Sequence, residues 1–262
     1  MKAIDFEYDS LSLSDFGMML CKFDSSGIET IGMPGITFNT VSVRHGIKHE
    51  LTSIEYADCL TFTLQICNNP CNGNSMEISL ETARDIARWL NRKSFNKFKL
   101  IDDEWYGIYV EASFNISRIE IGGKLVGFEL QATTNRPYFI SEPVIATLEL
   151  DSNEVVSIYN KSDEFGHIYP NMKITVKEAG DFEIYNAFED RSMVVKNCEA
   201  NEVITIDYPI ISSSLASHKI ANDFNWQFFR LASSFRNRLN EVKVSLPCTI
   251  ILEYNPIVKV GI

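Results

Sequence analysis

The sequence predicts a mainly β protein of two domains, an α+β domain over residues 1–140 and an antiparallel β-sandwich or jelly roll over residues 141–262. Short runs that alternate apolar and polar residues recur along the chain, and this period of two is typical of half-buried strands. One amphipathic helical segment interrupts the runs, in the first half only. The strand-like runs then continue from Pro143 to Pro256.

In the first half, the alternating runs predict a sheet or barrel against which the helix packs. Gly122-Gly123 stands between two such runs in RIEIGGKLVGFEL, and a pair of glycines there is a strong signal for a two-residue hairpin turn. The other predicted strands of this half are IDFEY (4–8), TFNTVSV (37–43), CLTFTLQI (59–66) and GIYVEASFNI (107–116).

The segment SLETARDIARWLNRKS, residues 79–94, predicts the helix. Ser79 is an N-cap residue type, an acidic residue follows in the first turn, and basic residues occur at the C-terminal end. A spacing of i, i+3, i+4, i+7 predicts one buried face, which consists of Ala83, Ile86, Ala87 and Leu90.

A boundary between the domains is expected near ATTNRPYFISEP, where Pro137 and Pro143 flank the end of the preceding hairpin. In the second half a turn is expected at Gly180-Asp181. The predicted strands there are KITVKEAG (173–180), DFEIYN (181–186), SMVVKN (192–197), EVITIDY (202–208), EVKVSL (241–246) and TIILEYN (249–255).

The charge balance argues against a nucleic-acid-binding protein. The net charge is −11, whereas tight binding to a phosphate backbone needs clustered Lys and Arg. We therefore expect no sequence-specific nucleic-acid partner. The chain has no apolar run of about 18 residues, so no membrane insertion is expected. Its acidic, alternating start does not resemble a secretory signal, which predicts synthesis in the cytoplasm.

No sequence signature of catalysis is present. The nucleophile-elbow, zinc-protease and phosphate-loop motifs are absent, and the carboxylates of DDEW (102–105) are adjacent rather than opposed across a cleft. Cys67 and Cys71 could converge with His45 and His49 on a metal, but their spacing is wider than that of the usual zinc knuckle. We expect no catalytic residue, no cofactor and no metal.

Two sets of residues are candidates for protein interfaces. One is a basic stripe on the helix, for which a solvated face, a protein interface and a nucleic-acid contact are the alternatives; its members are Arg84, Arg88 and Arg92. The other is a Gly- and Pro-rich segment leading into a strand-like run, with no helix of its own to pack on. Its members are Gly32, Pro34, Gly35, Phe38, Val41 and Val43.

The stretch NDFNWQFFRLASSFRNRLNEVKVS, residues 222–245, is rich in aromatics. Phe224, Trp226 and Phe228 alternate as in a strand, although Phe224, Phe228, Leu231 and Phe235 also fit a helical face. Single-stranded nucleic acid would favour basic residues between the aromatics, and a sugar platform would need them exposed. We interpret the aromatics as core, with Trp226 buried.

Three segments together resemble the distal tail proteins of long-tailed, siphovirus-type bacteriophages and prophages. They are FEYDSLSLSDFGMML (6–20), ARWLNRKSFNKFKLIDDEWYGIYVEASF (87–114) and NDFNWQFFRLASSFRNRLNEVKVSLPCTIILEYNP (222–256). The family's turn before Asn240 often carries a glycine, whereas Arg238 stands there in this chain. The resemblance runs over most of the chain and implies a ring-forming domain followed by a galectin-like β-sandwich.

The function that this resemblance implies is structural. A homohexameric ring would join the tail tube to the baseplate or tail tip of the virion and pass DNA through its lumen. Its partners would be the tail tube protein and the tail tip protein, with tape-measure and receptor-binding proteins as further partners. A carbohydrate-binding adhesin and a tail-associated hydrolase are the alternatives.

Overall fold

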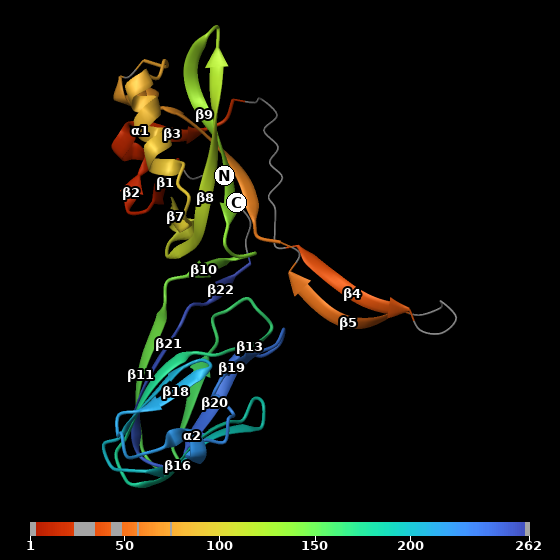
Figure 1. The fold of residues 1–262 in the computed structure, drawn as a ribbon, viewed down its shortest axis with the longest axis vertical. Coiled ribbons are helices and arrows are strands. Elements are labelled where there is room, and N and C mark those ends of the chain that lie inside the picture. Colours follow the sequence, from red (N-terminus) through yellow and green to blue (C-terminus); the bar gives the residue numbers. More distant parts are fainter. Residues whose placement is uncertain (1–3, 24–34, 43–48, 57, 74, 260–262) are drawn as a thin grey trace. The chain divides into compact units, whose positions relative to one another are not determined.

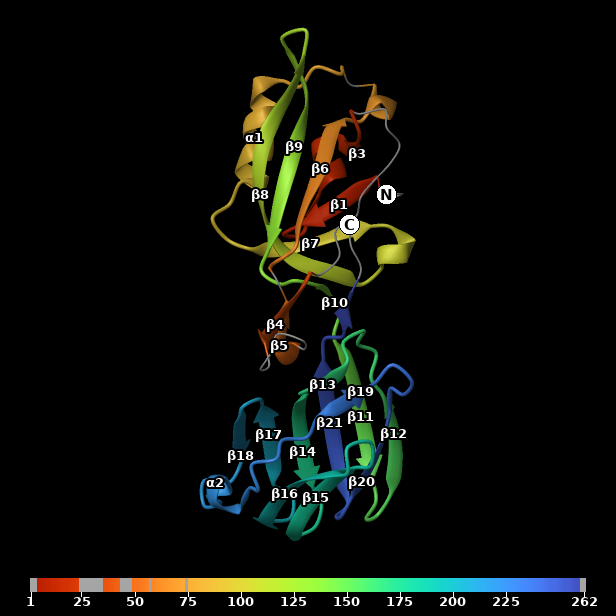
Figure 2. The same cartoon turned by 90° about the vertical axis from the view of Figure 1, so that its right-hand side faces the viewer.

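The computed structural model describes residues 4–23, 35–42, 49–56, 58–73 and 75–259. It divides into two compact units (Figures 1 and 2), of which unit 1 comprises residues 1–141 with 258–262, and unit 2 comprises residues 142–257. The chain therefore returns to unit 1 at its end. The two units are described separately below.

Unit 1 is built on one sheet with the strand order β2-β1-β7-β8-β9-β6-β3, beside which β10 pairs with β8 and β22 pairs with β10. The sheet is open, because its edge strands β2 and β3 do not pair with each other, so the barrel alternative is wrong. The strands are β1 (Asp5–Tyr8), β2 (Leu11–Ser12), β3 (Met18–Cys21), β6 (Thr61–Asn68), β7 (Asn96–Ile101), β8 (Ile108–Ile121), β9 (Lys124–Thr134), β10 (Phe139–Ser141) and β22 (Ile257–Val258).

Helix α1 (Leu80–Leu90) lies against one face of this sheet (Figure 1). The Ser79 hydroxyl accepts a 3.0 Å hydrogen bond from the Thr82 N–H, which confirms the predicted cap. The predicted buried face is correct except at Ala87, which is exposed; the buried residues are Ala83, Ile86, Trp89 and Leu90. The buried face is rotated toward Trp89, which packs with Ile86 and Leu90 in the aromatic core, whereas Ala87 lies on the opposite edge of this face.

Unit 1 also contains two β-hairpins, one within its main sheet and one separate from it. The β8–β9 hairpin turns at Gly122-Gly123, where φ is +61° and +75°, and positive φ at both central residues is the geometry expected of such a turn. The second hairpin pairs β4 (Ile36–Ser42) with β5 (His49–Tyr56) in a separate two-stranded sheet. The sequence predicts β4 but not β5.

Unit 2 is the predicted antiparallel sandwich, with a five-stranded sheet β11-β21-β14-β17-β18 facing a four-stranded sheet β12-β20-β15-β16 (Figure 2). A two-stranded sheet, β13-β19, and the short helix α2 (Ile220–Asp223) complete it. The strands are β11 (Val144–Leu150), β12 (Val155–Tyr159), β13 (Gly166–Ile168), β14 (Asn171–Val176), β15 (Gly180–Asn186), β16 (Arg191–Cys198), β17 (Val203–Asp207), β18 (Ile210–Ser213), β19 (Leu231–Ser233), β20 (Leu239–Val244) and β21 (Cys248–Tyr254).

The aromatic stretch of unit 2 contributes to the core only in part. Phe224, Phe228 and Phe229 are buried in the sandwich core, as predicted. Trp226 is 60% exposed and Phe235 is 86% exposed, so the interpretation of these two residues as core is wrong. Trp226 has a φ of +57°, and its ring lies 5.6 Å from that of Phe224 at the edge of the core, with most of its surface in solvent.

Candidate functional site

The β4–β5 hairpin separates apolar from polar side chains. Residues directly opposite each other in an antiparallel pair share one face, and the register pairs Ile36 with Tyr56, Phe38 with Ile54, and Thr40 with Leu51. A bulge at Thr52 separates the Asn39–Ser53 pair from the Thr40–Leu51 pair. One side therefore carries five apolar or aromatic residues, called here the hairpin apolar face: Ile36, Phe38, Leu51, Ile54 and Tyr56.

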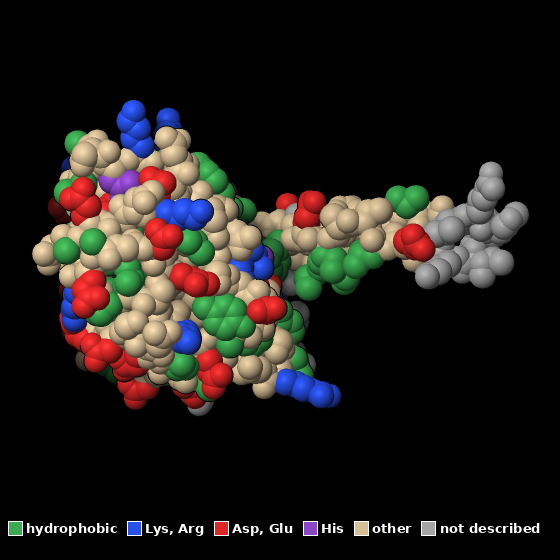
Figure 3. Space-filling view, turned by 90° about the horizontal axis from the view of Figure 1, so that it is seen from below, with side chains coloured by type: hydrophobic (Ala, Val, Ile, Leu, Met, Phe, Trp, Pro, Cys, Tyr) green, Lys and Arg blue, Asp and Glu red, His purple; other side chains and the backbone are tan. Residues whose placement is uncertain are grey.

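The opposite face of the hairpin is mainly polar, with Val41 as an exposed apolar residue on it. The Asn39 amide donates a 2.9 Å hydrogen bond to the Ser53 hydroxyl, and this hydroxyl lies 3.4 Å from Glu55 Oε1. In Figure 3, hydrophobic side chains gather along one side of the hairpin, and acidic side chains lie on the other side and near its tip. The hairpin is thus amphipathic, like a strand pair that covers a core.

The hairpin apolar face is open to solvent. Phe38 is 60% exposed and Ile54 is 55% exposed, although side chains of this size are usually buried in a folded protein. At the base of the hairpin, the rings of Tyr56 and Tyr138 lie 5.5 Å apart in an edge-on arrangement. The face therefore presents apolar surface that a second protein surface could cover.

The structure describes part of the interface segment predicted from the sequence. Gly35 precedes β4, and Phe38 and Val41 lie within it, all three exposed. The two side chains point to opposite faces of the hairpin. The remaining members, Gly32, Pro34 and Val43, lie outside the described residues.

Sequence reasoning missed the contribution of Leu51 and Ile54 on β5. The signal was hidden because the bulge at Thr52 puts these two apolar residues three positions apart, which breaks the alternation that marks a strand. A bulged strand next to an alternating one is recognisable only once the pairing is known.

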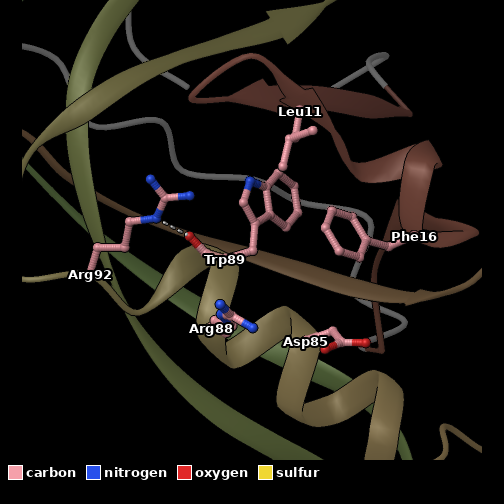
Figure 4. A pocket seen from close by; sticks show the side chains of 6 residues that line it. All are labelled: Leu11, Phe16, Asp85, Arg88, Trp89 and Arg92. Carbon is pink, nitrogen blue, oxygen red and sulfur yellow. Dashed lines mark hydrogen bonds between the residues drawn. The ribbon is translucent and has the colours of Figure 1, made fainter.

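A second surface feature is a shallow hollow of about 480 Å³ between α1 and the β2 region. Figure 4 shows its six lining side chains: Leu11, Phe16, Asp85, Arg88, Trp89 and Arg92. The Phe16 and Trp89 rings stack in its apolar floor, with their centroids 4.5 Å apart. Its rim carries both signs of charge, so the hollow shows no preference for an anion or a cation.

The predicted basic stripe is divided by the structure. Arg84 and Arg88 are exposed on α1, but Arg92 lies beyond the end of the helix. The Arg92 guanidinium bonds the Trp89 carbonyl oxygen at 2.8 Å and forms an ion pair with Asp9. Arg92 thus ties the helix end to the turn after β1 and is less available to a partner than the other two arginines.

The carboxylates of residues 102–105 and the cysteines considered as metal ligands lie in local turns and strands. Asp102 accepts a 2.9 Å hydrogen bond from the Glu104 N–H within a 3-10 turn, which is a local structural role. Cys67 lies in β6, Cys71 lies in a 3-10 turn, and His45 is outside the described residues. Across the residues that the structure describes, no group of three or more His, Cys, Asp or Glu side chains could hold a metal ion.

Family models cover almost the whole chain. A model described as a phage tail protein N-terminal domain matches residues 1–136, and one described as a phage tail C-terminal domain matches residues 138–254. The chain belongs to this family of phage tail proteins. The family match confirms the predicted resemblance.

A solved structure has the same fold as this phage tail protein. It is the crystal structure of SPP1 Dit, described as a paradigm of the hub adsorption apparatus in phages infecting Gram-positive bacteria. The TM-score is 0.66 at 11% sequence identity, over 97% of this chain and 99% of that one. No curated protein sequence matches the chain. None of the helices in the described ranges is long and apolar enough to cross a membrane.

Proposed function

We propose that this phage tail protein is a distal tail hub: a homohexameric ring, without a catalytic step, that joins the tail tube to the baseplate or tail tip of the virion. The fold similarity to SPP1 Dit supports this role, because that protein is described as a hub component. The single observation in this chain that carries the proposal is the exposed hairpin apolar face.

The hairpin apolar face needs a covering surface. A two-stranded hairpin alone is marginally stable in water, and contiguous exposed apolar surface marks interaction sites. A hairpin that covers a different patch on the next copy makes a head-to-tail contact, and such contacts generate closed rings when the rotation closes. We infer that the hairpin apolar face of one copy packs on the neighbouring copy.

Residues 1–140 form the ring in this proposal, and residues 141–262 form a peripheral sandwich. The hairpin belongs to unit 1, and the chain carries a net charge of −11. An acidic lumen would repel DNA phosphates and let DNA slide through without sticking. The tail tube and tail tip proteins would bind the two faces of the ring, with tape-measure and receptor-binding proteins as further partners.

One pair of substitutions tests the proposal with a matched control. Phe38→Lys places a charge on the hairpin apolar face, whereas Thr37→Lys places the same charge one residue earlier on the polar face, opposite Glu55. Light scattering and negative-stain images over a roughly hundredfold concentration range would follow the mass, because assembly depends on concentration.

We expect the wild type and Thr37→Lys to form rings, and Phe38→Lys to stay at the monomer mass of 29.8 kDa. Rings that Phe38→Lys leaves intact would contradict the role of the hairpin apolar face. A wild type that is monomeric at every concentration, alone and with the tail tube protein, would contradict ring formation itself.

A carbohydrate-binding role for unit 2 is a second candidate, and the exposure of Trp226 favours it. An exposed indole can stack on a sugar ring, whereas a core indole has no free face. Binding of the full chain to a glycan array, lost in Trp226→Ala, would support this role. If no glycan on the array binds the full chain, the carbohydrate-binding role is contradicted and only the structural hub function is supported.

A further inference from the structure

Two tyrosines stack face to face at one end of the sandwich in unit 2. The centroids of the Tyr169 and Tyr208 rings lie 3.9 Å apart, and the two rings are 8° from parallel. Tyr169 follows β13, whereas Tyr208 begins the turn between β17 and β18. Tyr208 remains 47% exposed in this arrangement. Two segments that are distant in sequence therefore present an aromatic surface to solvent.

Two further rings hold this stack from the side. The buried Phe228 ring meets the Tyr208 ring nearly at right angles, with the centroids 5.2 Å apart. The His167 ring meets the Tyr169 ring in the same manner, also at 5.2 Å. The Arg230 guanidinium lies 3.5 Å from the Tyr169 hydroxyl. An aromatic surface that is already held in place loses little side-chain entropy when a ligand packs on it.

Arg230 is itself fixed by Glu189. Its Nε donates a 2.8 Å hydrogen bond to Glu189 Oε2, and its Nη2 lies 2.7 Å from Oε1 of the same carboxylate. Such two-point pairs of guanidinium and carboxylate have a well-defined geometry. The charge of Arg230 is therefore balanced locally, and the pair keeps further N–H groups and carboxylate lone pairs for hydrogen bonds beside Tyr169.

Arg191, the first residue of β16, is not balanced in this way. Its guanidinium forms no hydrogen bond and no ion pair with any residue that the structure describes, and its Nε is buried. Its two terminal nitrogens are not buried, so they reach solvent. The neighbouring Asp190 carboxylate instead accepts a 2.9 Å hydrogen bond from the Tyr185 hydroxyl. Arg191 therefore offers N–H donors to a carboxylate or a phosphate.

The two arginines act on the same end of unit 2. Partial burial of the imidazole and then the charge of Arg230 lower the pKa of His167. The charge of Arg191 acts in the same direction, and that of Glu189 opposes it. A histidine with a lowered pKa is neutral at pH 7. Among the charges that act on this ring, two guanidinium groups and one carboxylate leave a positive surplus, although the whole chain carries −11.

We propose that this end of unit 2, called here the tyrosine–arginine site, binds a saccharide that carries a carboxylate or phosphate group. The C–H face of the sugar ring packs on Tyr208, because the face of an aromatic ring carries partial negative charge. The acid group binds the unpaired guanidinium of Arg191. Sugar hydroxyls exchange hydrogen bonds with the Arg230–Glu189 pair. The site consists of His167, Tyr169, Glu189, Arg191, Tyr208 and Arg230.

The chemistry of the site favours a saccharide over other ligands that stack on aromatic rings. Single-stranded nucleic acid carries one phosphate per nucleotide and needs several Lys or Arg residues along its path, whereas the site has one unpaired arginine. The core of a protein interface is depleted of charged residues, whereas charged groups adjoin this stack. The inference rests on the carbohydrate-binding role of unit 2, the second candidate function, but places the ligand at residues other than Trp226.

Saturation-transfer NMR on the full chain tests the site, because this method measures weak binding of small sugars. The probes are glucose and galactose, each as the neutral sugar, the uronate and the 6-phosphate, which differ only at carbon 6. We expect at least one acid form to bind about tenfold or more tightly than its neutral parent, because hydrogen bonds to charged groups are the stronger ones. The uronates and the 6-phosphates distinguish a carboxylate ligand from a phosphate ligand.

Three substitutions locate the bound sugar. Arg191→Gln lowers the affinity of the acid form to that of its neutral parent. Lys196→Gln removes the same charge at an exposed residue farther along β16 and keeps the preference for the acid form. Tyr208→Ala weakens every form by about tenfold. Should that variant not fold in a thermal melt, Tyr208→Leu replaces it, since leucine keeps apolar bulk without an aromatic face.

Acid forms that bind no more tightly than the neutral sugars, or a preference that survives Arg191→Gln, would overturn the proposal. A short oligothymidine that binds more tightly than any saccharide, and loses this binding in Arg191→Gln, would assign the site to nucleic acid instead. Acid-sugar binding that Trp226→Ala abolishes and Arg191→Gln leaves intact would overturn this site but support the carbohydrate-binding role of unit 2. None of these outcomes bears on ring formation, which is measured by mass.

Discussion

The indole N–H of Trp89 donates a 3.0 Å hydrogen bond to the carbonyl oxygen of Tyr8, which joins α1 to β1 across the core of unit 1. The same indole stacks on Phe6 with a centroid distance of 5.6 Å. A single side chain therefore contributes both apolar packing and a buried polar contact between the helix and the sheet. Such a contact fixes how the helix is rotated against the sheet.

Trp89→Phe is expected to lower the free energy of unfolding by about 2–4 kcal/mol, because it leaves the Tyr8 carbonyl without this donor and opens a small cavity. Leu80→Ala is the control, since it truncates an exposed side chain on the same helix and should change stability by about 0.5 kcal/mol or less. Denaturation followed by far-UV circular dichroism measures both. Equal effects of the two variants would contradict this role of Trp89.

Trp226→Ala is expected to change the stability of unit 2 by about 1 kcal/mol or less, because its side chain is largely in solvent. Phe228→Ala removes a ring that is 7% exposed and should cost about 3–5 kcal/mol. Thermal melts of the two variants give the comparison. A large loss for Trp226→Ala would restore the interpretation of this residue as core.

The contrast between buried Phe228 and exposed Trp226 shows what the sequence alone could not predict. Alternation predicts many of the strands: β1, the β8–β9 hairpin and six strands of unit 2 (β14, β15, β16, β17, β20 and β21) follow from local patterns, as does α1 from its helical spacing. The other five strands of unit 2 were not predicted. A positive φ at a tryptophan has no local signal. The Asn225 side chain stabilises this turn through 3.1 Å hydrogen bonds from the N–H groups of Val194 and Gln227, and the first of these contacts depends on tertiary structure.

The hairpin apolar face shows the same limit. The sequence predicts one strand of the hairpin through the alternation around Phe38 and Val41, but Leu51 and Ile54 escape because a bulge separates them. The basic stripe was predicted from helical spacing, yet the position of Asp9 decides that Arg92 is paired. Local periodicity therefore finds elements, whereas pairing across the fold decides which side chains remain available.

Thiol reactivity should divide the cysteines by burial. Burial raises the pKa of the Cys198 and Cys248 thiols to about 11, so little reactive thiolate is present near pH 8. Cys59 and Cys71 are exposed. We expect a disulfide reagent to label the two exposed cysteines quickly and the two buried ones slowly, with all six reacting in denaturant. Rapid labelling of Cys198 in the folded chain would show that unit 2 opens more readily than its packing implies.

The last prediction concerns Asn240, the second residue of β20. Its side chain is fully buried, and its Oδ1 accepts hydrogen bonds of 2.8 Å from the Ala232 N–H and from the Asn186 amide. Its Nδ2 donates a 3.0 Å bond to the Ala232 carbonyl oxygen. The amide therefore acts as donor and acceptor for the same residue of β19, which only an amide side chain of this length can do.

Asn240→Asp keeps the shape but turns the donor into a second acceptor and buries a negative charge. We expect a loss of about 3–5 kcal/mol near pH 7. Part of it should be recovered at acid pH, where a buried carboxyl is protonated and can donate again. Glu241→Gln, on the exposed face of the same strand, should be almost neutral. Urea denaturation of the three proteins at both pH values measures these differences. An Asn240→Asp variant as stable as the wild type at pH 7 would show that β19 is held by backbone pairing alone.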